Sequence, residues 1–226
     1  MAGVVMGLGT PKTPQVSLSA ELWHTGMGEN DRRNLGARYA QLFEARAAEL
    51  QKEITPASLQ TRYMACQQTL DELAAALAAV RPDVLVVFGD QGRDLSADQN
   101  LPPFSMYTGD TITVLPISMW RGAEHLRPAD LRVGIVAAGG LSHIVLNEAF
   151  DRQALNALRS RDLEVVWSLQ QPLEAQDHMA SGTGEVRCWV AAAGALEQLS
   201  MQLLRYEPCY RSAAGTGCGM AFALWR

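Results

Sequence analysis

A serine and a histidine follow a glycine pair at the end of an apolar run, in Gly139-Gly140-Leu-Ser142-His143. We predict that residues 131–138 form a buried strand, and open α/β sheets bind ligands just beyond the carboxyl ends of such strands. His143 would sit there, exposed and polar, so this join is a place for chemistry. The alternative is a tight turn in which His143 only bonds the backbone. The functional interpretation therefore requires other polar residues to converge on the same place.

Two further predicted strands end in polar residues. Residues 3–8 are a short apolar strand candidate, and the two prolines that follow place Lys12 on a loop, because proline disrupts regular elements. Residues 84–88 are predicted as a buried strand from their length and β-branched content, and Asp90 and Gln91 come directly after it. If the strands are neighbours, these side chains lie near the histidine.

Helices are predicted between the strands. Thr55 is an N-cap followed by a proline, and apolar residues then recur at spacings of three and four until the helix ends before Pro82. Asp151 is predicted to cap a second helix that runs to about Arg161. Further strands are expected at residues 163–167 and 220–225.

A third helix is expected to begin with Thr183 as its N-cap, which places Glu185 in the first turn. The helix dipole there stabilises an ionised carboxylate by about 0.3–1 kcal/mol. The alternation of strands and helices predicts a single α/β domain over residues 1–226, with a central, mostly parallel or mixed sheet and helices on both faces. In such a fold the converging residues are Lys12, Asp90, Gln91, His143 and Glu185.

Composition excludes several functional classes. The chain has 226 residues, 48% of them hydrophobic, which is enough for a full core. A net charge of −5 without a basic run argues against nucleic-acid binding. No apolar run approaches the roughly 20 residues that span a bilayer, so we expect no membrane association and a cytoplasmic protein. The cysteines are too dispersed for a CxxC metal site and are predicted to be buried thiols: Cys66, Cys188, Cys209 and Cys218.

Several motifs together resemble the class III extradiol ring-cleavage dioxygenases, relatives of the protocatechuate 4,5-dioxygenase catalytic subunit. They are Gly-Leu-Gly-Thr-Pro-Lys-Thr-Pro (residues 7–14), Val-Phe-Gly-Asp (87–90), Asn-Leu-Pro-Pro-Phe (100–104), Ala-Gly-Gly-Leu-Ser-His (138–143) and Gly-Thr-Gly-Glu-Val-Arg-Cys-Trp (182–189), with the closing segment 206–219. The resemblance covers most of the chain. It implies that family's α/β fold and a role in aromatic-compound metabolism.

The resemblance also implies a site. In that family two histidines and a glutamate bind Fe(II), leaving positions for catecholate and O₂, and a further histidine is the acid/base. By motif, Glu185 matches the glutamate and His143 the acid/base, whereas Lys12 and Gln91 stand where the iron histidines belong. The segment between Tyr107 and the central strand is also shorter than in the family. The candidate substrate-binding residues are Asp90, Gln91 and Ser142.

The two replacements weaken an iron site. A lysine ammonium has no lone pair, and a glutamine oxygen is a weak ligand for a transition metal. We therefore expect no bound cofactor, although Fe(II) is the cofactor of the family. Lys12 paired with Glu185 would fill the metal's position with a positive charge, which is the interpretation we favour. Lys12 as a catalytic clamp or amine nucleophile is the alternative.

Three functional hypotheses remain open. The first is a divergent enzyme that acts on a small oxygenated aromatic (catechol-like) or carbonyl compound, with His143 as acid/base. The second is a non-catalytic partner subunit of a ring-cleavage dioxygenase. The third is an active extradiol dioxygenase with altered metal ligands. The expected partners are the small ligand and either further copies of this chain or a paralogous dioxygenase subunit.

Overall fold

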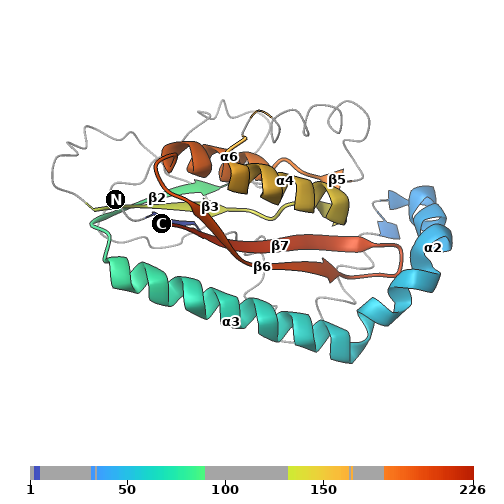
Figure 1. Cartoon of the computed structure of the whole chain (residues 1–226). Coiled ribbons are helices and arrows are strands. Elements are labelled where there is room, and N and C mark those ends of the chain that lie inside the picture. The colour runs from blue at the N-terminus through green and yellow to red at the C-terminus, as the bar shows by residue number, and fades with distance from the viewer. Residues whose placement is uncertain (1–2, 6–31, 34, 90–131, 163, 165–180) are drawn as a thin grey trace, which may run out of the picture.

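Helices cover both faces of the β-structure. The computed structural model describes residues 3–5, 32–33, 35–89, 132–162, 164 and 181–226. Helix α3 (Pro56–Val80) lies along one face, and α4 (Glu148–Ser160) and α6 (Val186–Ala195) lie on the other (Figure 1). An α/β fold with helices on both faces agrees with the prediction.

The larger sheet is built around the last strand. Strand β7 (Thr216–Trp225) pairs with β6 (Met201–Tyr210), β1 (Gly3–Val5) and β4 (His143–Val145), and β4 also pairs with β5 (Ser181–Gly182). All of these pairings are antiparallel. The short connection between β6 and β7 accounts for part of this, because a hairpin turn can only join antiparallel strands.

A second, two-stranded sheet is parallel. Strands β2 (Val84–Gly89) and β3 (Val133–Ala138) pair with Val86 opposite Ile135, close to the predicted strand boundaries. Strand β3 also packs against β1, which brings the two sheets side by side. The β-structure is therefore mixed, as one form of the prediction allowed. The other form, a mostly parallel sheet, is wrong for the described part of the chain.

Helix α3 begins where the sequence predicted. The Thr55 hydroxyl accepts a hydrogen bond from the backbone N–H of Ser58 at 3.2 Å, and proline occupies the first turn. Arg81 ends the helix in the left-handed conformation (φ 47°), immediately before Pro82. The sequence thus contained both boundaries of the longest helix among the described residues.

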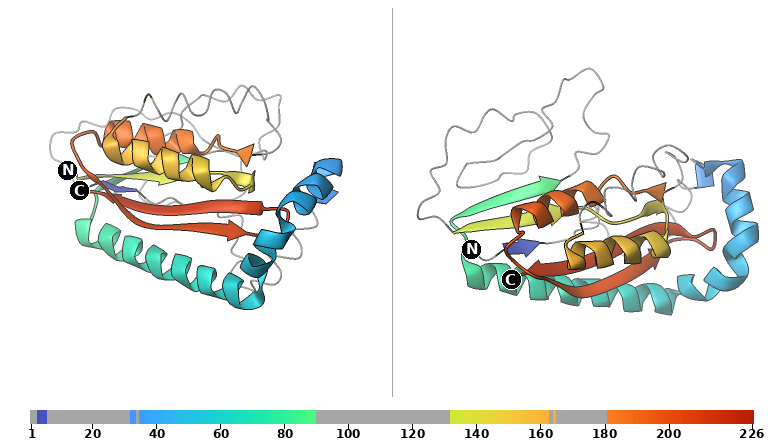
Figure 2. Two further views of the ribbon diagram at one scale, coloured as in Figure 1. Left: turned by 45° about the vertical axis from the view of Figure 1, so that its right-hand side comes forward. Right: turned by 45° about the horizontal axis from the view of Figure 1, so that its top comes forward.

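Helix α2 (Ala37–Leu50) and the 3₁₀-helix η1 (Gln51–Ile54) precede α3 and were not predicted. Together with the first two turns of α3 they form what we call the helical arm, residues 37–62. Figure 2 shows from two further sides that α2 lies at the opposite end of the molecule from the carboxyl terminus.

Two predicted helix starts need correction. Helix α4 is capped by Asn147, whose side-chain oxygen accepts from the N–H of Phe150 at 3.0 Å, and Asp151 is fully buried inside the first turn instead. Helix α6 has Glu185 as its N-cap residue, so Thr183 lies before the helix. Strand β7 begins earlier than the predicted residue 220. The predicted strand at residues 163–167 lies outside the described residues.

Within the described residues the core has one large cluster between the sheets and helices α4 and α6, a smaller one beneath α3, and two small ones beside α2 and η1. Trp189 of α6 is fully buried and packs against Trp225 of β7, with ring centroids 6.2 Å apart. Leu73 of α3 packs against Phe222 on the opposite face of β7. Each such side chain contributes roughly 1.5–3 kcal/mol to folding by its burial.

The cysteines are free thiols. Cys66, Cys209 and Cys218 are buried, which confirms the prediction for these three, whereas Cys188 is half-buried. Burial raises the pKa of Cys218 to about 12. A thiol that holds its proton is a poor nucleophile, so Cys218 acts as a core side chain. Among the described helices, none has the length and apolar character needed to cross a membrane.

Candidate functional site

The site predicted from the sequence is centred on the turn from β3 to β4, residues 139–142. His143 follows this turn as the first residue of β4, where it pairs with Gly182 of β5 and Cys218 of β7. The sequence predicted an exposed histidine in a strand-to-helix turn. The structure instead places a half-buried histidine in a short strand that has a neighbour on each side.

The imidazole of His143 is closely packed. It lies against Gly182, where a Cβ added to the glycine would come within 2.5 Å of Nε2, so only glycine fits there. The Nδ1 atom is buried and has no hydrogen-bond partner among the described residues. Buried polar atoms in native proteins are nearly always paired, so an unpaired one requires an explanation.

Backbone strain lies next to this histidine. Ile144 has φ 72°, in the left-handed region that β-branched residues rarely adopt. Such a conformation costs about 1–3 kcal/mol, persists only where surrounding structure enforces it, and is common at functional sites. Here the pairing of β4 with both β5 and β7 supplies the constraint.

Glu185 reaches the same turn from α6. Its carboxylate accepts a hydrogen bond from the N–H of Gly140 at 2.5 Å, and the residue is 5% exposed. A Cβ at position 139 would lie 2.9 Å from the Cβ of Glu185, which accounts for the glycine there. Trp189 also donates from its indole to the Gly139 carbonyl at 3.0 Å. The turn that leads to His143 and the start of α6 are therefore in direct contact.

A buried hydrogen-bond network fixes the other end of the turn. Asp151 accepts from the N–H of Ser142 at 2.8 Å, from its hydroxyl at 2.9 Å and from the Tyr206 hydroxyl at 2.7 Å. The Ser142 hydroxyl accepts in turn from the N–H of Asn147 at 2.9 Å. Ser142 and Asp151 are both fully buried. In this structure the Ser142 hydroxyl is engaged in positioning the turn, and its predicted role in substrate binding stays a prediction.

Asp151 is the important residue that sequence reasoning misassigned. Burial raises the pKa of its carboxyl group to about 6, although the hydrogen bonds from Tyr206 and Ser142 oppose that shift. Burial also raises the pKa of Tyr206. A Cβ at Gly219 would lie 2.1 Å from the Asp151 carboxylate, so a glycine of β7 makes room for it. An aspartate near a helix start resembles a cap in sequence, and only the fold shows that it is buried.

Three of the predicted site residues are not among those that the structure describes. Lys12, Asp90 and Gln91 lie outside the described residues, so their approach to His143 stays a prediction. The described ranges contain no cluster of three histidine, cysteine, aspartate or glutamate side chains arranged to hold a metal ion. The described residues include one iron ligand expected from the family, Glu185, and its carboxylate accepts a hydrogen bond from the Gly140 amide. One carboxylate does not make up the facial triad.

Comparison of the chain with known protein families, with curated proteins and with solved structures finds no match. The resemblance to extradiol dioxygenases therefore rests on the sequence motifs themselves.

Proposed function

We propose that this chain is a divergent member of the class III extradiol dioxygenase family that binds a small oxygenated aromatic (catechol-like) or carbonyl compound beside the β3–β4 turn. The observation that carries the proposal is the buried Nδ1 of His143, which has no hydrogen-bond partner among the described residues and adjoins the strained Ile144. A phenolic hydroxyl of the ligand would donate its hydrogen bond to this nitrogen.

His143 would then act as the acid/base. Transfer of the phenol proton to Nδ1 leaves a phenolate and an imidazolium, and the reverse transfer returns the proton to the product. Glu185 would act by positioning, because its carboxylate accepts the hydrogen bond of the Gly140 N–H and so fixes the turn that leads to the imidazole. General acid/base catalysis of this kind contributes about 10²–10⁴-fold to a rate.

Iron has no assigned step in this mechanism. In the family it activates catecholate and O₂, but a lysine and a glutamine replace its histidines here, and neither is a suitable ligand. Lys12 as a charge partner of Glu185 is part of the proposal. The third hypothesis, a dioxygenase with altered ligands, would require donors from outside the described residues.

One observation favours the second candidate function, a non-catalytic partner subunit of a ring-cleavage dioxygenase. The Glu185 carboxylate is buried and already bonded to the backbone of the turn, as expected for a group whose role is structural. Co-expression with a ligand-complete paralogue tests this candidate. A stable complex with that paralogue, in which His143→Gln leaves ring cleavage unchanged, would support it over the enzyme.

The primary proposal is tested by NMR titration with 3,4-dihydroxybenzoate and with an aromatic aldehyde, 4-hydroxybenzaldehyde, which represent the two proposed ligand types. We expect one of them to cause a saturable change in the His143 ring nitrogen shifts. His143→Gln should weaken its binding at least tenfold, equivalent to about 1.4 kcal/mol. Unchanged His143 shifts at saturating concentrations of both compounds would contradict the proposal.

A further inference from the structure

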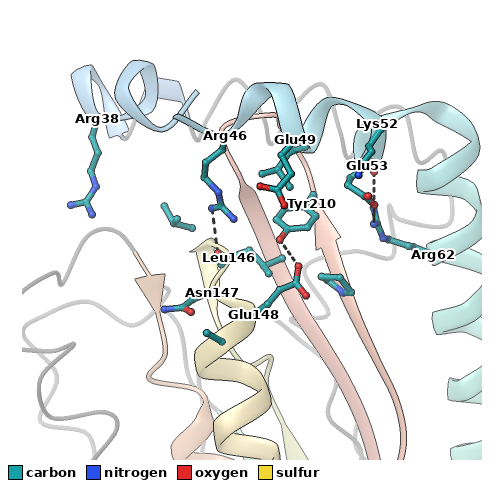
Figure 3. Close-up of a pocket in the computed structure, with 14 residues that line it drawn as sticks. Arg38, Arg46, Glu49, Lys52, Glu53, Arg62, Leu146, Asn147, Glu148 and Tyr210 are labelled. Carbon is teal, nitrogen blue, oxygen red and sulfur yellow. Dashed lines mark hydrogen bonds and ion pairs between the residues drawn. The ribbon is translucent and has the colours of Figure 1, made fainter. Parts of the chain in front are cut away.

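A cavity of about 730 Å³ lies between the helical arm and the core, at a different place from the β3–β4 turn (Figure 3). Its volume is within the range of about 300–1,000 Å³ that is typical of small-molecule sites. One wall is formed by α2 and η1, and the opposite wall by the loop from β4 to α4, with β6 behind. Positively and negatively charged side chains line the cavity, so it suits a polar ligand.

Arg46 is a cation of this cavity whose guanidinium packs against an aromatic ring. Its guanidinium lies 5.9 Å from the ring centroid of Tyr210, and Arg62 lies 5.8 Å from the same ring. Gly215 makes room for Arg46, because a Cβ there would lie 2.1 Å from Nη1. The Tyr210 ring thus attracts the guanidinium, and the bare glycine leaves room for it to lie there before any ligand binds, which lowers the entropy lost on binding.

The donors of Arg46 are largely unused within the described structure. Its one hydrogen bond there is to the Leu146 carbonyl, at a long 3.5 Å. Arg62, by contrast, is paired with Glu53. A guanidinium has five N–H donors in a planar fork that matches a carboxylate or another oxyanion. Figure 3 shows Arg46 directed into the space between α2 and Asn147.

The acidic side chains restrict which oxyanion fits. Burial raises the pKa of Glu148, but hydrogen bonds from Tyr210 (2.6 Å) and Arg152 (2.8 Å) outweigh this effect and lower it. Glu148 is therefore ionised, and Glu49 lines the same space. The lining carries one more cation than carboxylate, which suits a ligand with a single negative charge, and the carboxylates accept hydrogen bonds from hydroxyl groups. The cations are Arg38, Arg46, Lys52 and Arg62, and the carboxylates are Glu49, Glu53 and Glu148.

We propose that this cavity binds a small monocarboxylate that also carries hydroxyl groups. The carboxylate bonds to the fork of Arg46, and the hydroxyl groups donate to Glu49 and Glu148. This site is independent of the function proposed for His143, and neither proposal requires the other.

The test is a calorimetric and NMR titration of the full chain with gluconate, a six-carbon monocarboxylate with several hydroxyl groups. Three comparison compounds each change one feature: glucose is uncharged, hexanoate carries no hydroxyl group, and inorganic phosphate carries more charge. We expect saturable binding of gluconate, with shifts at Arg46 and Tyr210, and weaker binding of all three comparison compounds.

Variants separate the site from nonspecific attraction. Arg46→Met should weaken gluconate binding at least tenfold, and Arg46→Lys, which keeps the charge but not the fork, should weaken it less. Arg159→Met removes an exposed cation of α4 outside the cavity and should leave binding unchanged. Thermal melts identify any variant that fails to fold, and Arg46→Lys then serves as the test.

Several results would overturn the proposal. They are the absence of saturable gluconate binding, equal affinity in the folded Arg46 variant and the wild type, and binding of phosphate or hexanoate that is as tight as that of gluconate.

Discussion

The β3–β4 turn and the cavity of the helical arm are built in opposite ways. The turn is made of backbone and buried groups: Ser142 and Asp151 are fully buried, and two glycines bring Glu185 against the chain. The cavity is made of long charged side chains, several of them exposed. A site of the first kind holds its geometry through sterics, and one of the second kind through electrostatics and side-chain reach. The two should therefore respond differently to mutation.

Gly219→Ala should have the largest effect on stability. Its new methyl group would lie 2.1 Å from the Asp151 carboxylate, which three hydrogen bonds hold in place. Overpacking and a disrupted buried network together should cost about 4 kcal/mol in the free energy of unfolding, measured with urea. The control is Gly184→Ala, where a Cβ meets nothing within 4 Å. A similar small effect in both variants would show that the turn can adapt to the added methyl group. That result would contradict the view that the turn holds its geometry through close packing.

The second-largest effect should be the contribution of Asp151 to the pH dependence of stability. Its folded pKa is raised from 3.8 to about 6, so between these values the native state binds the proton more tightly than the unfolded chain. The stability from this group is present below pH 3.8 and lost as pH rises through about 6. The difference in unfolding free energy between wild type and Asp151→Asn should therefore fall by up to about 3 kcal/mol over that interval.

Asp71→Asn, an exposed aspartate of α3, is the matched control for this titration. The difference between wild type and this control measures the effect of removing an exposed carboxylate over the same interval, and it is subtracted from the difference for Asp151→Asn. A difference for Asp151→Asn that is flat, or that rises with pH, would contradict the assigned pKa and with it the buried network as the basis of the turn.

Ile144→Gly measures the strain of β4. Glycine adopts φ 72° without steric cost, so the substitution recovers part of the roughly 1–3 kcal/mol of strain while losing side-chain packing. Val145→Gly loses similar packing but relieves no left-handed strain. We expect Ile144→Gly to be more stable than Val145→Gly by about 1–2 kcal/mol in thermal or urea unfolding. Equal losses would show that the histidine is not held by a strained backbone.

Gly215→Ala should have the smallest effect on stability. This would sharpen the contrast between the closely packed turn and the cavity of flexible side chains. Its Cβ would also lie 2.1 Å from a neighbour, but that neighbour is the end of the flexible Arg46 side chain. The positive φ of 81° should cost about 1 kcal/mol, while the arginine moves aside. Gluconate binding should nevertheless weaken, because the guanidinium loses its position. Full affinity in this variant would contradict the role assigned to Gly215.

Local signals explain what could be predicted from the sequence. Thr55 and the proline after it define the start of α3, and Pro82 defines its end, because caps and prolines act within a few residues. Strands β2 and β3 are apolar runs of the usual strand length. The sequence placed Glu185 in one site with His143 through the convergence of strand ends with a helix start and through the family resemblance, but it did not predict the hydrogen bond of Glu185 to Gly140.

Other features depend on contacts between residues far apart in the chain, and these features could not be predicted from the sequence. Strand β6 contains Arg205, Glu207 and Pro208, a composition that does not indicate a strand, and it forms through pairing with β7. The cavity joins Arg46 to Leu146, residues far apart in the chain. Asp151 has a cap-like sequence context, and its actual partner Tyr206 is 55 residues away. None of these pairings leaves a periodic pattern in the sequence.

Pro208 limits how other chains can associate with this sheet. It lies opposite Gly219, whose N–H and carbonyl bond to the β3–β4 turn at Ser142 and Leu141, so this is a non-hydrogen-bonded pair of β6 and β7. The backbone nitrogen of Pro208 accordingly faces the outer edge of β6, where any other residue would offer a donor to an incoming strand. The proline thus interrupts the ladder that β-addition or aggregation would use. A homo-oligomer that continued the sheet past β6, an edge among the described strands, would therefore lack a backbone hydrogen bond at this position.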